Sequence, residues 1–152
     1  MFKRVTSEIN KVDALFKLEV DIINDEVRAY WAEYLCVRVA GLIEAVLRII
    51  LFCYAKNKSH ENVSRYVSKK VEGVTNLNSE KIENLLGEFS ATWQECYVKI
   101  ITDSQKAAIG NIYINRNKVG HGRNSELSYY RVKEYYKEIK GALLAIIKIV
   151  EA

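Results

Sequence analysis

Apolar residues recur every three or four positions along almost the whole of this 152-residue chain. That spacing follows the turn of an α-helix and gathers the apolar side chains on one face, whereas a half-buried strand would alternate every second residue. No stretch alternates convincingly in that way. The sequence also contains no proline, the residue that most often interrupts a helix from within. The pattern therefore predicts an all-α protein.

The N-terminal part of the chain is predicted to form two long helices. The first repeats apolar residues from Val5 to Phe16 and continues through Ile23 towards Tyr30. The second carries an apolar stripe that begins at Leu35 and ends in the polar run AKNKSHEN. With the shorter helices that follow, we expect a helical bundle of about six helices.

The stretch from Tyr34 to Tyr54 is long enough to raise the question of a membrane span. It also carries Arg38, Glu44 and Arg48, and each such charge costs roughly 2.5–3.5 kcal/mol at a bilayer centre. We therefore expect a buried helix of a soluble bundle and no membrane partner. The N-terminus has no apolar core like that of a signal peptide, and three cysteines without metal-type spacing are typical of reduced, buried thiols, so we expect a cytoplasmic protein.

Helix-end signals divide the rest of the chain. Short helices are predicted at about Glu61–Val71, Glu80–Phe89 and Thr92–Thr102, with Asn78 or Ser79 capping one of them. The run TDSQ from Thr102 has the form of a capping box and predicts a further helix, for which Gly120 is a natural C′ residue. Apolar steps of three and four from Tyr129 to Val150 predict a long C-terminal helix. We find no domain boundary and expect residues 1–152 to form a single domain.

One of the two histidines lies in the segment INRNKVGHGRN, residues 114–124. Arg116 falls in the same stripe as Ile109, Ile112 and Val119, where the pattern favours an apolar residue. A guanidinium in that position needs a carboxylate, a phosphate or water in a cleft, because a buried unpaired charge is costly. One alternative is a structural pair with Glu44, which would hold Arg116 in place. Glu44 can also pair with Arg48, one turn along its own helix.

His121 lies five residues after Arg116, about 140° around an unbroken helix. The two side chains converge only if the helix breaks between them, or if a second subunit completes the site. Gly120 and Gly122 bracket the histidine and permit such a break, because glycine accepts left-handed backbone at little cost.

The string RNKVGHG resembles the RN-x-x-x-HG form of the RiboL-PSP branch of the HEPN families. The layout of long and short helices is similar as well. The resemblance implies a helical homodimer in which two motifs face each other and cleave RNA without a metal ion. In such enzymes the 2′-hydroxyl attacks the adjacent phosphate and leaves a 2′,3′-cyclic phosphate end.

Carried onto this sequence, the resemblance makes His121 the general acid or base. Arg116 would bind the scissile phosphate, and Asn117 would orient the phosphate or the imidazole. An imidazole ordinarily both takes and gives a proton near neutral pH, and a guanidinium donates a two-pronged fork to phosphate oxygens. Lys118 and Arg123 flank the motif and would contact neighbouring phosphates, or else belong to a solvated basic loop.

The charge balance and the expected chemistry limit which classes of partner are expected. The excess of 23 basic over 19 acidic residues permits a polyanion such as RNA without requiring one. We expect no metal and no cofactor. The resemblance implies a toxin or antiviral defence effector, held in check by an antitoxin-like protein or a nucleotidyltransferase partner. The alternative is a non-catalytic HEPN module that binds RNA or a nucleotide, or that mediates assembly.

Overall fold

A computed structural model of the chain describes residues 1–18 and 24–152. These residues form seven helices and no strand, which confirms the all-α prediction with one helix more than expected. The helices are α1 (Phe2–Lys17), α2 (Asp25–Lys58), α3 (Glu61–Glu72), α4 (Ser79–Phe89), α5 (Ala91–Ile100), α6 (Asp103–Gly120) and α7 (Tyr129–Glu151).

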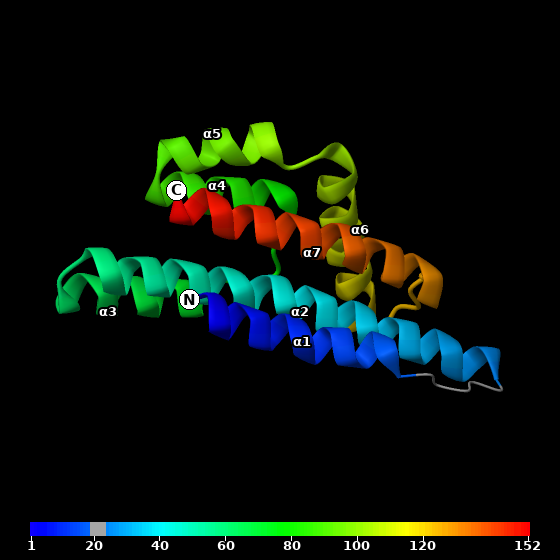
Figure 1. The fold of residues 1–152 in the computed structure, drawn as a ribbon. Coiled ribbons are helices and arrows are strands. Elements are labelled where there is room, and N and C mark those ends of the chain that lie inside the picture. Colours follow the sequence, from blue (N-terminus) through cyan, green and yellow to red (C-terminus); the bar gives the residue numbers. More distant parts are fainter. Residues whose placement is uncertain (19–23) are drawn as a thin grey trace.

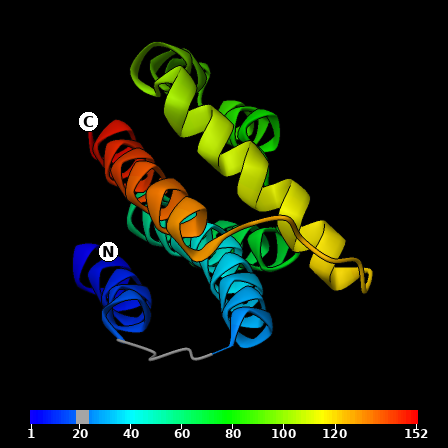
Figure 2. The same ribbon diagram turned by 90° about the vertical axis from the view of Figure 1, so that its right-hand side faces the viewer.

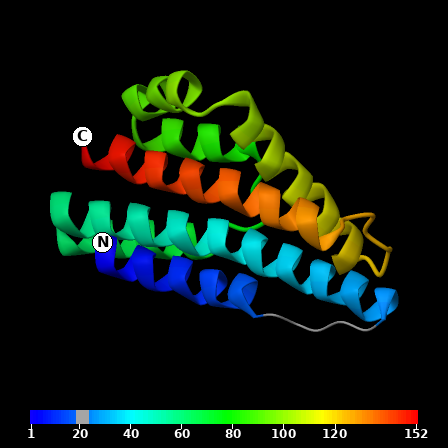
Figure 3. The same cartoon turned by 45° about the vertical axis from the view of Figure 1, so that its right-hand side comes forward.

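The long helices α2 and α7 run alongside each other in the middle of the bundle (Figure 1). α1 packs along α2, and α3 folds back along the second half of α2. α4 and α5 form a helical hairpin on the other side of α7, and α6 crosses the bundle steeply, in contact with both α2 and α7 (Figure 2). The C-terminal end of α6 therefore lies on the side of the molecule away from both chain termini (Figure 3).

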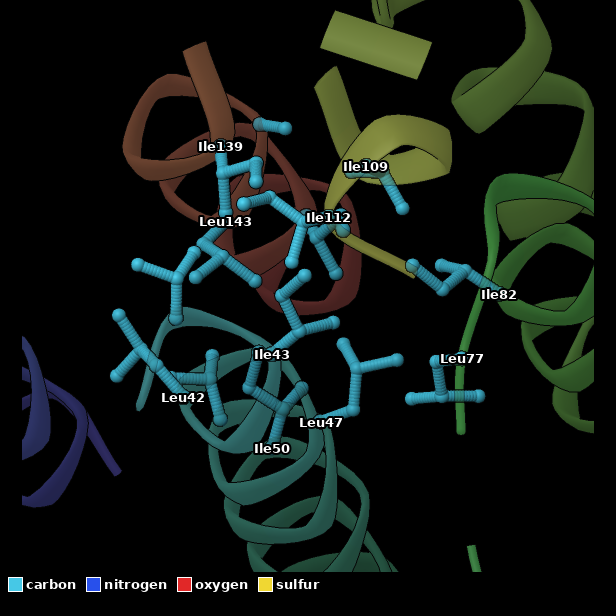
Figure 4. Packing of buried hydrophobic residues seen from close by; sticks show 14 of the residues in the cluster. Leu42, Ile43, Leu47, Ile50, Leu77, Ile82, Ile109, Ile112, Ile139 and Leu143 are labelled. Atoms are coloured by element: carbon cyan, nitrogen blue, oxygen red, sulfur yellow. The ribbon is translucent and has the colours of Figure 1, made fainter. Parts of the chain in front are cut away.

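The core forms where α2, α6 and α7 meet (Figure 4). The connector before α4 and α4 itself also contribute to it. The core includes the branched aliphatic side chains of Leu42, Ile43, Leu47, Ile50, Leu77, Ile82, Ile109, Ile112, Ile139 and Leu143. Each of these is at most 8% exposed, and full burial of one such side chain stabilises a fold by about 1.5–3 kcal/mol. The core thus fixes α6, and with it the motif, against two long helices.

The boundary between the first two helices differs from the prediction. The prediction that the first helix continues towards Tyr30 is wrong, because α1 ends at Lys17 and a new helix begins at Asp25. The side chain of Asn24 accepts a hydrogen bond from the backbone N–H of Glu26 at 2.8 Å and caps the new helix. The predicted continuation through Ile23 lies outside the described residues.

The N-terminal ends of α4 and α6 follow the sequence signals closely. Asn78 caps α4 by accepting from the N–H of Lys81 at 2.8 Å. Thr102 and Gln105 form both hydrogen bonds of the predicted capping box. The apolar seam of α7 is buried from Val132 to Val150. Along the described ranges, no helix combines the length and the hydropathy that a membrane span requires.

The prediction of buried thiols holds for one cysteine of three. Cys36 is buried in the core, whereas Cys53 and Cys96 are only half-buried. All three are free thiols. The sequence placed all of them in apolar or amphipathic stretches, but the latter two lie at the edge of their helices' buried faces.

Candidate functional site

The motif occupies the last turn of α6 and the cap that follows it. The predicted C′ position at Gly120 is wrong, because Gly120 is still helical and His121 is the C-cap. Gly122, with φ of +69°, takes the left-handed C′ position. Its N–H donates to the carbonyl of Val119 at 3.0 Å, and the N–H of Arg123 donates to that of Lys118 at 2.8 Å. This pair of hydrogen bonds is a Schellman cap, which requires the left-handed residue after the histidine, not before it.

The buried stripe of α6 also differs from the prediction. It contains Ala108, Ile109, Ile112 and Asn115, whereas Arg116 is half-buried at its edge. The side chain of Asn115 donates to the carbonyl of Asn111 at 2.9 Å, so its amide nitrogen is satisfied within the helix. A backbone carbonyl of the same helix cannot compensate the burial of a charged guanidinium in this way, and therefore the asparagine faces inward.

Arg116 is held by two neutral side chains. Its Nη1 donates to Oδ1 of Asn76 at 3.5 Å and to Oδ1 of Asn117 at 3.4 Å. No carboxylate pairs with it anywhere in residues 1–18 and 24–152. In the same residues its Nε and Nη2 make no hydrogen bond. One edge of a positively charged fork is therefore available for an anion.

Glu44 does not contact Arg116 directly. Its Oε1 accepts the backbone N–H of Asn76 at 2.6 Å, and its Oε2 lies 3.4 Å from Nη2 of Arg48. The structural pair with Arg116 is thus wrong, and the pairing of Glu44 with Arg48 is confirmed. The carboxylate is linked to Arg116 through Asn76, whose N–H donates to Glu44 and whose Oδ1 accepts from Arg116.

His121 is exposed. Its backbone N–H donates to the carbonyls of Asn117 at 3.0 Å and Lys118 at 3.2 Å. Among the described residues no hydrogen bond joins its imidazole to Arg116. Because the helix runs unbroken through Gly120, a single chain does not bring the two side chains together in the way that a break would have done.

His121 instead shares a face with other residues of α6. Gly110, Ile114, Asn117 and His121 follow one another in steps of four, three and four, on the side of the helix opposite the buried stripe. We call these four residues the outer face of α6. Ile114 is 51% exposed in the middle of it, and a Cβ built on Gly110 meets nothing within 4 Å. The outer face is open, partly apolar and carries two motif residues.

The flanking basic residues lie at the same end of α6. Lys118 is half-buried and Arg123 is exposed. The loop that follows is tied back to α2, because the N–H of Ser125 donates to Oε1 of Glu33 at 3.1 Å. The first half of α2 is therefore a neighbour of the motif.

Two residues near the site were not predicted, Asn76 and Glu33. Asn76 has a φ of +57°, and asparagine is among the residues that adopt this conformation most readily. The polar run TNLNSE predicts a connector, but no local pattern indicates that it reaches a residue 40 positions later. No cluster of three or more histidine, cysteine, aspartate or glutamate side chains with metal-binding geometry occurs in the part of the chain that the structure describes.

An all-helical bundle with Arg-Asn in the last turns of its penultimate helix and His-Gly three residues further on resembles a HEPN-type protein. The comparison with protein families agrees: the model of the RiboL-PSP-HEPN family matches residues 3–152. The chain belongs to this family. No curated protein and no solved structure matches it.

Proposed function

We propose that this protein is a metal-independent endoribonuclease that acts as a homodimer and leaves 2′,3′-cyclic phosphate ends. The observation that carries the proposal is the guanidinium of Arg116, which is held at one nitrogen by two neutral amides and has no carboxylate partner in the described residues. A cation arranged in this way is suited to a phosphate, because no protein anion has to be displaced first.

The proposed reaction is an internal transfer at phosphorus. The 2′-oxygen forms a bond to the adjacent phosphorus as the bond from phosphorus to the 5′-oxygen breaks. The imidazole of His121 takes the proton of the 2′-hydroxyl and, as an imidazolium, delivers a proton to the leaving 5′-oxygen. Nε and Nη2 of Arg116 donate to the non-bridging oxygens as negative charge builds on them. Only RNA supplies the 2′-hydroxyl, so DNA is not cleaved.

The position of His121 supports the proposed dimer. Arg116 and His121 lie about 140° apart on α6, so one chain presents them in different directions. Two copies that meet along the outer face of α6 would bring each His121 towards the other subunit. Gly110 and the exposed side chain of Ile114 support such a contact, since a glycine lets a second helix approach closely and an exposed isoleucine gains from burial. Arg116 lies at the edge of the buried stripe and would reach the shared cleft from beside Asn117, to which it donates a hydrogen bond.

Mixed dimers test the shared cleft. Arg116→Ala and His121→Ala chains are each expected to be inactive as homodimers. When the two chains are co-expressed with different tags and the mixed dimer is isolated, one arginine and one histidine remain in the cleft, and we expect RNA cleavage to return in part. A mixed dimer as inactive as both parents would contradict a shared site.

The alternative, a HEPN module that binds without cleaving, predicts a different result in the same material. RNA would bind to the parent protein and to His121→Ala equally, and would stay intact in both. A role as a toxin or antiviral effector adds a cellular expectation: expression of the parent slows growth, expression of His121→Ala does not, and an antitoxin-like or nucleotidyltransferase partner relieves the effect.

A further inference from the structure

The connector between α3 and α4 is fastened to α2 by two charged side chains. Arg48 donates to the carbonyl of Val74 from Nη2 at 2.7 Å and from Nε at 3.2 Å. Glu44 accepts the N–H of Asn76 at 2.6 Å. The two side chains are themselves an ion pair one turn apart, and the Glu44 side chain is only 14% exposed. Together they fix the backbone on both sides of Thr75.

This fastening sets an uncommon backbone conformation at Asn76. Its φ of +57° lies in the left-handed region, which residues other than glycine seldom occupy and which asparagine tolerates best. Its carbonyl accepts a hydrogen bond from Nζ of Lys81 at 3.1 Å, so the backbone is held from the α4 side as well. Such a conformation persists where surrounding contacts determine it, and here they also determine where the side chain points.

The Asn76 side chain is directed at Arg116. Its Oδ1 lies 3.5 Å from Nη1 of the guanidinium. An amide oxygen orients a guanidinium without neutralising it, whereas a carboxylate would compete with a phosphate for the same charge. Asn76 and Asn117 both bind Nη1, so the hydrogen bonds of the motif arginine converge on one nitrogen and leave the opposite edge of the fork unused in the described residues.

We infer that Asn76 is a positioning residue for the reaction: Glu44 and Arg48 hold it in a left-handed turn so that its amide aims the free edge of Arg116 at the scissile phosphate. The inference rests on the proposed function. It also gives Glu44 its part in the site, which is to hold Asn76 and not to touch Arg116.

The substitution Asn76→Gly tests the side-chain amide, because it removes that group and leaves the backbone in place. Glycine adopts a φ of +57° without strain and keeps the backbone N–H that bonds to Glu44. Thr75→Gly is the matched control, because it adds the same backbone freedom to the same connector one residue earlier and removes no contact to Arg116. Both variants should stay folded, with only a small change in thermal stability.

We expect Asn76→Gly to lower kcat for RNA cleavage by about tenfold with KM changed by less than about twofold. A guanidinium that has lost its orientation still attracts the substrate but aligns poorly with the transition state. Thr75→Gly should retain the kinetics of the parent. If the parent cleaves RNA and the two glycine variants are kinetically alike, the inference is overturned and the proposed function stands.

A second measurement decides the inference if the parent does not cleave RNA and the proposed function fails. The ¹⁵N relaxation of the Arg116 guanidinium reports its mobility without any substrate. Greater mobility in Asn76→Gly than in Thr75→Gly supports the positioning role. Equal mobility in the two variants overturns it.

Discussion

The amide oxygen of Asn117 lies 3.4 Å from Nη1 of Arg116, although the two residues are adjacent in α6 and their side chains leave the helix in different directions. Asn117 is also one turn before His121 on the outer face of α6. It therefore stands between the proposed phosphate-binding group and the proposed proton-transfer group, and it contacts the first of them.

The neutrality of Asn117 is the basis of the first prediction. Asn117→Ala removes the hydrogen bond, and we expect kcat/KM for RNA to fall by about tenfold. Asn117→Asp keeps an oxygen near Nη1 but adds a negative charge that pairs with Arg116 and repels phosphate, so its kcat/KM should fall further than that of the alanine variant. Steady-state kinetics on a labelled oligoribonucleotide measure both. Full activity in the aspartate variant would show that charge at this position does not matter.

Arg116 and Glu44 should differ in their effects on stability. Arg116 is half-buried, and its partners are neutral amides that water can satisfy, so Arg116→Ala should change the free energy of unfolding by less than about 1 kcal/mol. Glu44→Ala leaves the N–H of Asn76 and the guanidinium of Arg48 without their partner, and should cost about 1–3 kcal/mol. Urea denaturation compares the two. The reverse order would make Arg116 a structural residue.

Cys36 should be the least reactive of the three thiols. Burial, together with the nearby carboxylate of Glu33, raises the pKa of Cys36 to about 12, and its Sγ donates to the carbonyl of Ile112 at 3.6 Å. Because the thiolate is the reactive form, iodoacetamide at pH 8 should label Cys53 and Cys96 well before Cys36 in the folded protein. Mass spectrometry of tryptic peptides measures the order, and denatured protein, in which all three thiols are exposed, serves as the control.

An acid-sensitive contact joins α1 to α7. Burial alone would raise the pKa of Asp13, but hydrogen bonds from Lys140 at 2.7 Å and from the hydroxyl of Tyr136 at 2.6 Å outweigh burial and lower it. A carboxyl whose pKa is lower in the folded state stabilises the fold above its ordinary pKa of about 4, and the contribution is lost as the pH falls through the folded-state value. Asp13→Asn should therefore lose less stability than the parent between pH 7 and pH 3.

Urea denaturation at the two pH values measures this contribution. Glu95→Gln, which changes an exposed carboxylate of α5, is the control and should lose as much stability on acidification as the parent. If Asp13→Asn and Glu95→Gln respond alike, the contact of Asp13 with Lys140 and Tyr136 does not contribute to acid sensitivity. The partial exposure of both charged side chains limits the expected difference to about 1 kcal/mol.

Local signals explain what the sequence could predict. The capping box at Thr102, the seam of α7 and the N-cap at Asn78 depend on residues a few positions apart, and each is confirmed. The motif residues were chosen from their resemblance to the RN-x-x-x-HG pattern, and their roles remain predictions. The inward face of α6 was misjudged by one position, because residues three and four steps after Ile112 lie almost equally close to the buried side. Asn115 is buried and Arg116 is not, because α6 itself offers the Asn115 amide a hydrogen-bond acceptor in the carbonyl of Asn111.

Long-range contacts explain what the sequence could not. Gly120 and Gly122 are equally good candidates for a helix end, and only the backbone hydrogen bonds show that the second takes the left-handed position. Asn76 is 40 residues from Arg116 in the sequence. The contact between them depends on how Glu44 and Arg48 of α2 hold the connector between α3 and α4. No periodicity within a single helix reports such a contact.

The central claim is that the motif cleaves RNA by a metal-independent route in which His121 transfers a proton. The most direct measurement incubates the purified protein with an RNA oligonucleotide in excess EDTA, beside His121→Ala and the control His60→Ala, which changes the other histidine at the start of α3. A matched oligonucleotide with 2′-deoxyribose is the substrate control. We predict fragments with 2′,3′-cyclic phosphate ends, identified by mass spectrometry, from the parent and His60→Ala only, and none from the deoxy substrate. Intact RNA in every sample, from protein that is folded and dimeric, or cleavage that persists in His121→Ala, would contradict the claim.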